Sequence, residues 1–232
     1  MALVSANGNG EVHNLTQSGY NEGNAKWVLG GKAIIFSSDR AGYRSHGSWG
    51  SEDDVYIMFL DLDAYERFRM TKEEKVLSDE AEKEKKKEQE TADKGKNEKK
   101  KNDKKKKKGA DDDKPAVQPL VFDLENCQDR IARLTVNSSR LGDYVLSNGG
   151  DTLYYQAAFE GGMDLWKHDL RENKTEIVLK DVGQGQMMAD KDGKNLFVCT
   201  GKGIKKIDLA KGKPEAVSYE ANFNYRPQQE RE

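Results

Sequence analysis

The chain has 232 residues and a formal net charge of −2, with 34% charged and only 35% hydrophobic residues. No run approaches the 18 or so apolar residues of a membrane helix, and residues 1–8 lack the basic start and apolar stretch of a signal peptide. A soluble protein without membrane insertion is therefore expected, and its compartment, periplasmic or cytoplasmic, stays open.

The N-terminal part of the sequence predicts β-structure. Residues 10–16 contain a strand-like run, and residues 27–36 form a hairpin pattern around Gly30-Gly31. A second β-rich run follows at residues 54–61 and ends in Leu60-Asp61. These segments predict adjacent antiparallel strands.

The connection between these strands, residues 39–50, is long and rich in cationic and aromatic side chains. Loops that a rigid scaffold presents to solvent commonly carry function. We therefore assign a peptide-contacting role to Asp39, Arg40, Arg44, His46 and Trp49. A plain connecting loop with no ligand is the alternative.

A charged segment, residues 72–114, follows and contains 17 lysines, 14 acidic residues and no aromatic residue. Such a composition cannot bury enough apolar surface to offset chain entropy, so a disordered insertion within a blade is expected. Transient helix over residues 77–90 is compatible with its Glu and Lys pairs. The interspersed acids argue against nucleic-acid binding. Contact with an acidic face of a neighbouring subunit stays open.

Strand-like runs resume at residues 119–124 and 130–135, and two further repeats follow. Each repeat contains a Gly hairpin, a run ending in an Asp-Leu step and one more strand; they cover residues 144–179 and 187–219. The 43-residue spacing from Gly150 to Gly193 lies within the period of four-stranded propeller blades. We predict an all-β partial β-propeller of about three blades and part of another. Its predicted segments are residues 1–71, the insertion 72–114 and residues 115–232.

The repeats resemble those of a known family. Residues 27–40 combine a tryptophan, a Gly turn, a β-run and Ser38-Asp39-Arg40, which resembles the propeller repeat of translocation-associated and tricorn-type proteins. Residues 122–135, preceded by a charged insertion and followed by a Gly-Gly hairpin, look like the second propeller of tricorn-type serine peptidases. The resemblance covers nearly the whole chain.

The resemblance implies a non-catalytic propeller that gates or guides peptides or unfolded polypeptides to a catalytic domain outside this chain. Its expected partners are the remaining propeller, PDZ-like and catalytic domains of a parent serine peptidase, and further copies of itself. A translocation-associated-type propeller that binds a protein or a glycan is the alternative. The two differ in whether a peptidase domain is encoded downstream.

No catalytic, metal or cofactor site is expected from the residues themselves. Ser45, His46 and Ser48 are crowded in one loop, but such neighbours rarely reach triad geometry, and no Gly-x-Ser-x-Gly elbow is present. The three histidines lack the paired spacing of metal ligands.

The cysteines and several aromatic residues are interpreted as structural. Cys127 and Cys199 are too few for a disulfide framework, and each lies in a strand-like run, so both are expected to be buried free thiols. Packing between blades is expected for Trp27, Tyr154, Trp166 and Phe197.

Overall fold

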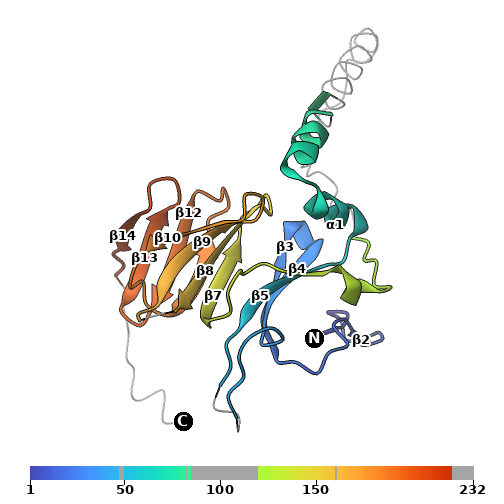
Figure 1. Ribbon diagram of the computed structural model, residues 1–232, viewed down its shortest axis with the longest axis horizontal. Coiled ribbons are helices and arrows are strands. Elements are labelled where there is room, and N and C mark those ends of the chain that lie inside the picture. The colour runs from blue at the N-terminus through green and yellow to red at the C-terminus, as the bar shows by residue number, and fades with distance from the viewer. Residues whose placement is uncertain (47–49, 82, 85–119, 160, 221–232) are drawn as a thin grey trace, which may run out of the picture.

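The computed structural model describes residues 1–46, 50–81, 83–84, 120–159 and 161–220. Within them, three four-stranded antiparallel sheets follow one another along the chain (Figure 1). In each sheet every strand pairs with the next strand in sequence. The predicted partial β-propeller is therefore confirmed, and each sheet is one blade.

Blade 1 contains β3 (Glu22–Val28), β4 (Ala33–Ser38), β5 (Asp54–Phe59) and β6 (Ile131–Arg133). Blade 2 contains β7 (Arg140–Leu146), β8 (Thr152–Ala158), β9 (Asp164–Asp169) and β10 (Lys174–Leu179). Blade 3 contains β11 (Gly185–Ala189), β12 (Asn195–Thr200), β13 (Gly203–Asp208) and β14 (Lys213–Val217). A short pair, β1 (Ala2–Leu3) with β2 (His13–Asn14), precedes blade 1, and single 3₁₀ turns occupy η1 (Leu29–Gly31) and η3 (Cys127–Arg130).

The hairpin turns of blades 2 and 3 repeat one another closely. Gly150 and Gly193 take φ values of +76° and +67°, which favour glycine because it has no Cβ. The side-chain amide of Asn148 donates a 3.1 Å hydrogen bond to the carbonyl of Lys191, so the two turns touch. The 43-residue period thus corresponds to one step from blade to blade.

The leucine after the third strand also has the same role in every blade. Its N–H donates to the carbonyl of the residue just before the second strand, at 2.9, 2.9 and 3.0 Å; the pairs are Leu60 with Lys32, Leu170 with Asp151, and Leu209 with Lys194. The Leu60-Asp61 step of blade 1 and the Asp-Leu steps at residues 169–170 and 208–209 therefore mark the ends of the third strands.

The blades pack face to face through apolar side chains. Ile35, Ile57 and Phe59 of blade 1 form one core with Tyr144 and Tyr155 of blade 2. The other face of blade 2 packs on blade 3, where Tyr154 and Leu165 meet a buried set consisting of Met187, Leu196, Val198 and Ile207. N-terminal residues, including Leu15, cover the remaining face of blade 1. Burial of these side chains stabilises the stack of blades.

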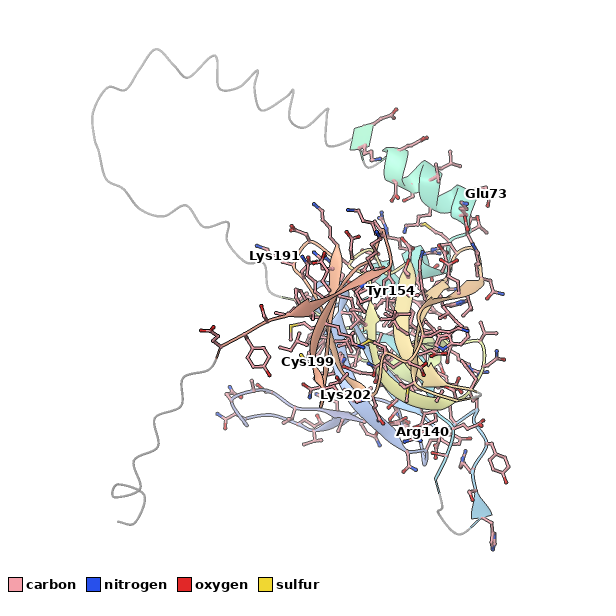
Figure 2. All side chains as sticks on the ribbon, turned by 90° about the vertical axis from the view of Figure 1, so that its left-hand side faces the viewer. Glu73, Arg140, Tyr154, Lys191, Cys199 and Lys202 are labelled. Atoms are coloured by element: carbon pink, nitrogen blue, oxygen red, sulfur yellow. The ribbon has the colours of Figure 1, made fainter. Side chains whose placement is uncertain are left out.

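The outer face of blade 3 differs from what the sequence predicted. Cys127 is buried as expected, but Cys199 is exposed on β12, in Figure 2 on the side of blade 3 that faces the viewer. Phe197, on the same face of β12, is half-buried beside Met188, which is 72% exposed. The expectation that Cys199 is buried was therefore wrong. Alternation along β12 directs Leu196 and Val198, not Phe197 and Cys199, to blade 2.

Two further expectations fail in blade 1. Trp27 is half-exposed and stacks on Phe122, with ring centroids 5.7 Å apart, instead of packing between blades. The strand expected over residues 119–124 is absent from its described part, residues 120–124. The strand expected over residues 130–135 is present at residues 131–133, which pair with β5.

Residues 60–130 lie between two adjacent strands of blade 1, β5 and β6. They begin with helix α1 (Leu62–Arg69), whose N-terminus is capped by Asp61 through a 2.8 Å bond from the Ala64 N–H. Tyr65 and Phe68 of α1 pack on the ring of Phe59, with centroids 5.5 and 5.0 Å apart. Helix α1 is thereby held against blade 1.

Arg171 of blade 2 holds the end of α1. Its guanidinium donates to the carbonyls of Phe68 and Met70 at 2.7 and 2.5 Å, and its Nε donates to Asp151 at 2.9 Å. A cation at a helix C-terminus interacts favourably with the unpaired carbonyls there.

The start of the charged segment is helical, over residues 72–81 and at 83 and 84. Thr71 and Glu74 form a capping box at its N-terminus, with bonds of 3.2 and 2.8 Å. Lys72 and Lys75 pair with Glu172 and Asp151 of blade 2. This helix thus begins before Leu77, while residues 85–114 lie outside the described residues. In the described part of the chain, no helix is long and apolar enough to cross a membrane.

Candidate functional site

The connection between β4 and β5 forms a hairpin that projects beyond the blades, at the end opposite to α1 (Figure 1). Ser45 N–H donates to Gly50 at 3.1 Å, and Glu52 N–H donates to Tyr43 at 2.8 Å. At its base, Asp53 and Ser139 exchange backbone hydrogen bonds. The hairpin is thus joined to the segment that links blades 1 and 2.

Asp39 is the anchor of the hairpin rather than an exposed contact residue. Its side chain is only 3% exposed and accepts two 3.1 Å hydrogen bonds from Asn21. The Arg44 guanidinium donates to the Asp39 carbonyl at 3.3 Å. These bonds fix the direction in which the hairpin leaves the sheet.

Arg40 is also occupied by neighbouring groups. Its guanidinium donates to Glu22 at 2.7 Å and lies over the Tyr56 ring, 4.8 Å from the centroid. Tyr20 lies beneath both Arg40 and Arg44, at 5.7 and 4.8 Å. Cation–π contacts of this kind stabilise the hairpin base.

Glu22 completes this network from β3. Burial would raise its pKa, but hydrogen bonds from the N-terminal amino group, Ser18 and Thr16 hold the pKa below the usual range. The carboxylate is therefore ionised at neutral pH and keeps its pair with Arg40.

The structure thus brings together three of the five predicted site residues, Asp39, Arg40 and Arg44. His46 is exposed, and Trp49 lies outside the described residues. Tyr43, which the sequence interpretation did not select, is 72% exposed on the same hairpin. The exposed side chains of the hairpin are therefore Tyr43, His46 and Arg44, of which Arg44 is half-exposed and also pairs with Asp39. A peptide-contacting role for the hairpin stays a prediction.

A second polar cluster joins the first strands of all three blades. Asp143 of β7 accepts from Lys26 Nζ at 2.5 Å and Asn24 Nδ2 at 2.8 Å, both of β3. Its other oxygen accepts from the Met187 N–H of β11 at 2.7 Å. One carboxylate therefore holds three blades at their inner strands.

This cluster makes stability depend on pH. Burial would raise the pKa of Asp143, but hydrogen bonds from Lys26, Met187 and Asn24 outweigh it and hold the pKa below its usual range. Because the folded pKa lies below the unfolded value of about 3.9, the stabilisation is complete above that value and is lost as the pH falls through the folded pKa.

We expect Asp143→Asn to lower the free energy of unfolding by about 1–3 kcal/mol at pH 7. The difference from the wild type should shrink as the pH falls from about 5 to 2. Urea unfolding at a series of pH values measures it, with Asp192→Asn in the exposed turn before β12 as the control. A difference that does not vary with pH would show that the Asp143 carboxylate does not carry this interaction.

A pocket of about 810 Å³ on blade 2, beside the segment that links blades 1 and 2, escaped the sequence interpretation. Trp166, assigned to packing between blades, both touches the blade 1–blade 2 core and lines this pocket. One signal was present in the sequence: the β8–β9 connection is longer than the two-residue β12–β13 turn and contains Phe159 and two glycines. Among the described residues, no group of three His, Cys, Asp or Glu side chains could hold a metal ion.

No family model and no curated protein sequence matches the chain. Among solved structures, the tricorn protease is similar at a TM-score of 0.49 and 12% identity, over 90% of this chain and 18% of that chain. TolB from Acinetobacter baumannii is similar at a TM-score of 0.49 and 12% identity, over 97% of this chain and 39% of that chain. The chain thus spans well under half of either protein, and the propeller assignment rests on the sheets described above.

Proposed function

We propose that this chain is a non-catalytic propeller segment of a tricorn-like serine peptidase, and that its β4–β5 hairpin contacts peptides or unfolded polypeptides on their way to a catalytic domain. The projecting hairpin carries the proposal. Its base is fixed by Asp39 and Arg40, while Tyr43, Arg44 and His46 remain available to a ligand. Tyrosine and arginine are enriched among the residues that dominate protein-binding energies.

The peptidase part of the proposal is supported by the residue patterns of segments 27–40 and 122–135. It is tested on the complete reading frame from which this chain derives. A peptidase domain encoded downstream is expected. A complete frame without one would overturn this part and leave the binding role of the hairpin to be judged separately.

The binding part is tested with fluorescently labelled β-casein, an unfolded polypeptide, by anisotropy. The double variant Tyr43→Ala, Arg44→Ala is expected to bind at least about tenfold more weakly, because it removes an exposed ring and a cation together. Tyr219→Ala is the matched control, since Tyr219 is exposed to a similar degree, 68% against 72%, but lies after β14. Equal binding by the wild type and the double variant would contradict the proposal.

A further inference from the structure

The pocket on blade 2 opens along the outer strand of that blade, β10. Its walls come from the segment after β6 and from blade 2, where β8, β9, β10 and the connections next to these strands all line it. Its volume of about 810 Å³ lies in the range of pockets that bind small ligands or side chains.

Large apolar side chains gather around this pocket while remaining exposed. Val136, Phe159 and Ile177 are 47, 41 and 40% exposed, and all three line it. Phe159 meets Trp166 edge to face, with centroids 5.1 Å apart and planes at 88°. The Trp166 N–H already donates to Ala157 at 3.3 Å, so the tryptophan offers the pocket its ring surface. An apolar ligand group would remove all of this surface from water.

The rim carries polar side chains without partners. Within the described part of the chain, the side chains of Asn137, Asn173 and Asp181 make no hydrogen bond or ion pair. Asp164 is different, since its carboxylate accepts the Asp181 N–H at 2.8 Å and fixes that corner of the rim. Unpartnered amide and carboxylate groups around an apolar floor can fix the orientation of a ligand.

Strand β10 is also open along one edge. It pairs with β9 on one side, and no described strand pairs with its other side. Thr175 and Ile177 point to the pocket face of β10, and residues 174–177 are all exposed. Such an edge can accept an extended peptide as an added strand, with side-chain pockets giving the specificity.

We propose that an extended polypeptide segment binds alongside β10 and places one large apolar side chain, aromatic or branched aliphatic, between Phe159, Trp166 and Ile177. Two rings at right angles form a corner that fits a compact apolar side chain better than the flat face of a sugar. The unpaired edge of β10 beside this corner favours a peptide over a glycan, because only a peptide carries a backbone that continues the sheet.

This inference deepens the proposed function by giving a second contact for polypeptides, remote in sequence from the β4–β5 hairpin. The two can fail independently. If only the hairpin variant bound polypeptide more weakly, the pocket would have no role in binding. If only the pocket variants did, the hairpin would have none.

The test uses the full chain and a labelled, blocked pentapeptide, Thr-Lys-Phe-Thr-Thr, with binding followed by anisotropy. Ile177→Asp should weaken binding at least about tenfold, because it places a charge on the apolar wall. A pentapeptide N-methylated at the two residues around phenylalanine should also bind at least about tenfold more weakly, because it keeps the side chain but cannot pair with β10. Phe159→Ala serves as a second variant. The control is Val4→Asp, because Val4 lies in the N-terminal segment and is 52% exposed, against 40% for Ile177.

Circular dichroism and thermal unfolding check that each variant remains folded before its binding is compared. Unchanged binding by both Ile177→Asp and Phe159→Ala would overturn the pocket, and equal binding of the N-methylated peptide would overturn strand addition to β10. Binding of chitohexaose at this pocket in place of the peptide would also overturn the proposal, in favour of a glycan site.

Discussion

Replacing Gly185 with alanine should lower the free energy of unfolding by about 3 kcal/mol or more. A Cβ at this position would lie 1.9 Å from the carbonyl oxygen of Cys199 on the neighbouring strand, a contact that only a shift of the backbone can relieve. The Gly185 N–H also donates to Gln156 of blade 2 at 3.2 Å, so the shift would loosen the join between blades 2 and 3.

Urea unfolding at pH 7 measures this effect. Gly201→Ala is the matched control, because a Cβ at Gly201 would meet nothing within 4 Å. A loss below 1 kcal/mol in Gly185→Ala, with the control unchanged, would show that β11 and β12 can separate at little cost.

Replacing Phe59 with alanine should cost about 3–5 kcal/mol. Phe59 is fully buried and connects three parts of the molecule: blade 1, the facing core of blade 2 and the rings of Tyr65 and Phe68 on α1. Its removal leaves a cavity and deprives α1 of the surface on which it packs. Hydrogen exchange in α1 should therefore accelerate more than exchange in blade 3.

Phe122→Ala is the control for this variant. Phe122 also contacts blade 1, by stacking on Trp27 of β3, but it is 37% exposed. If the two phenylalanine variants lost similar stability, or if α1 exchanged as slowly as before, the role given to Phe59 would be wrong.

The propeller could be predicted because short segments of the sequence indicate the turns and strands of its repeat. Gly150 and Gly193 adopt the left-handed backbone that their turns require, and the Asp-Leu steps at residues 169–170 and 208–209 end the third strands of blades 2 and 3. Short β-rich runs indicated the central strands of each blade. These features depend on neighbours in the sequence, so a single sequence contains them.

The first strands of the blades were harder to predict. Strand β7 begins at Arg140, before the expected start at Tyr144, and its pairing shifts between Leu141 and Tyr144. The irregular stretch contains Gly142 and Asp143, residue types that disfavour strands in isolation. They are tolerated because Gly142 gives room to Gln156 and Asp143 binds β3 and β11, contacts that only the assembled blades supply.

The contacts that occupy the charged residues of the predicted site were not foreseen from the sequence. The described part of the loop, residues 39–46 and 50, does project from the blades, as a long polar connection indicates. Asp39 and Arg40, however, are used by Asn21 and Glu22, each 18 residues away along the chain. No local pattern shows that a charged side chain will be taken by such a partner.

The position of the charged insertion also affects how blade 1 assembles. Four residues join the third and fourth strands of blades 2 and 3, whereas residues 60–130 separate β5 from β6. Closing the longer loop costs about 2.5 kcal/mol more chain entropy. The three-residue β6 gives few hydrogen bonds in return, but α1, Arg171 and the helix from residue 72 shorten the span that must be closed. The contacts at the base of the insertion thus lower the entropy cost of pairing β6 with β5.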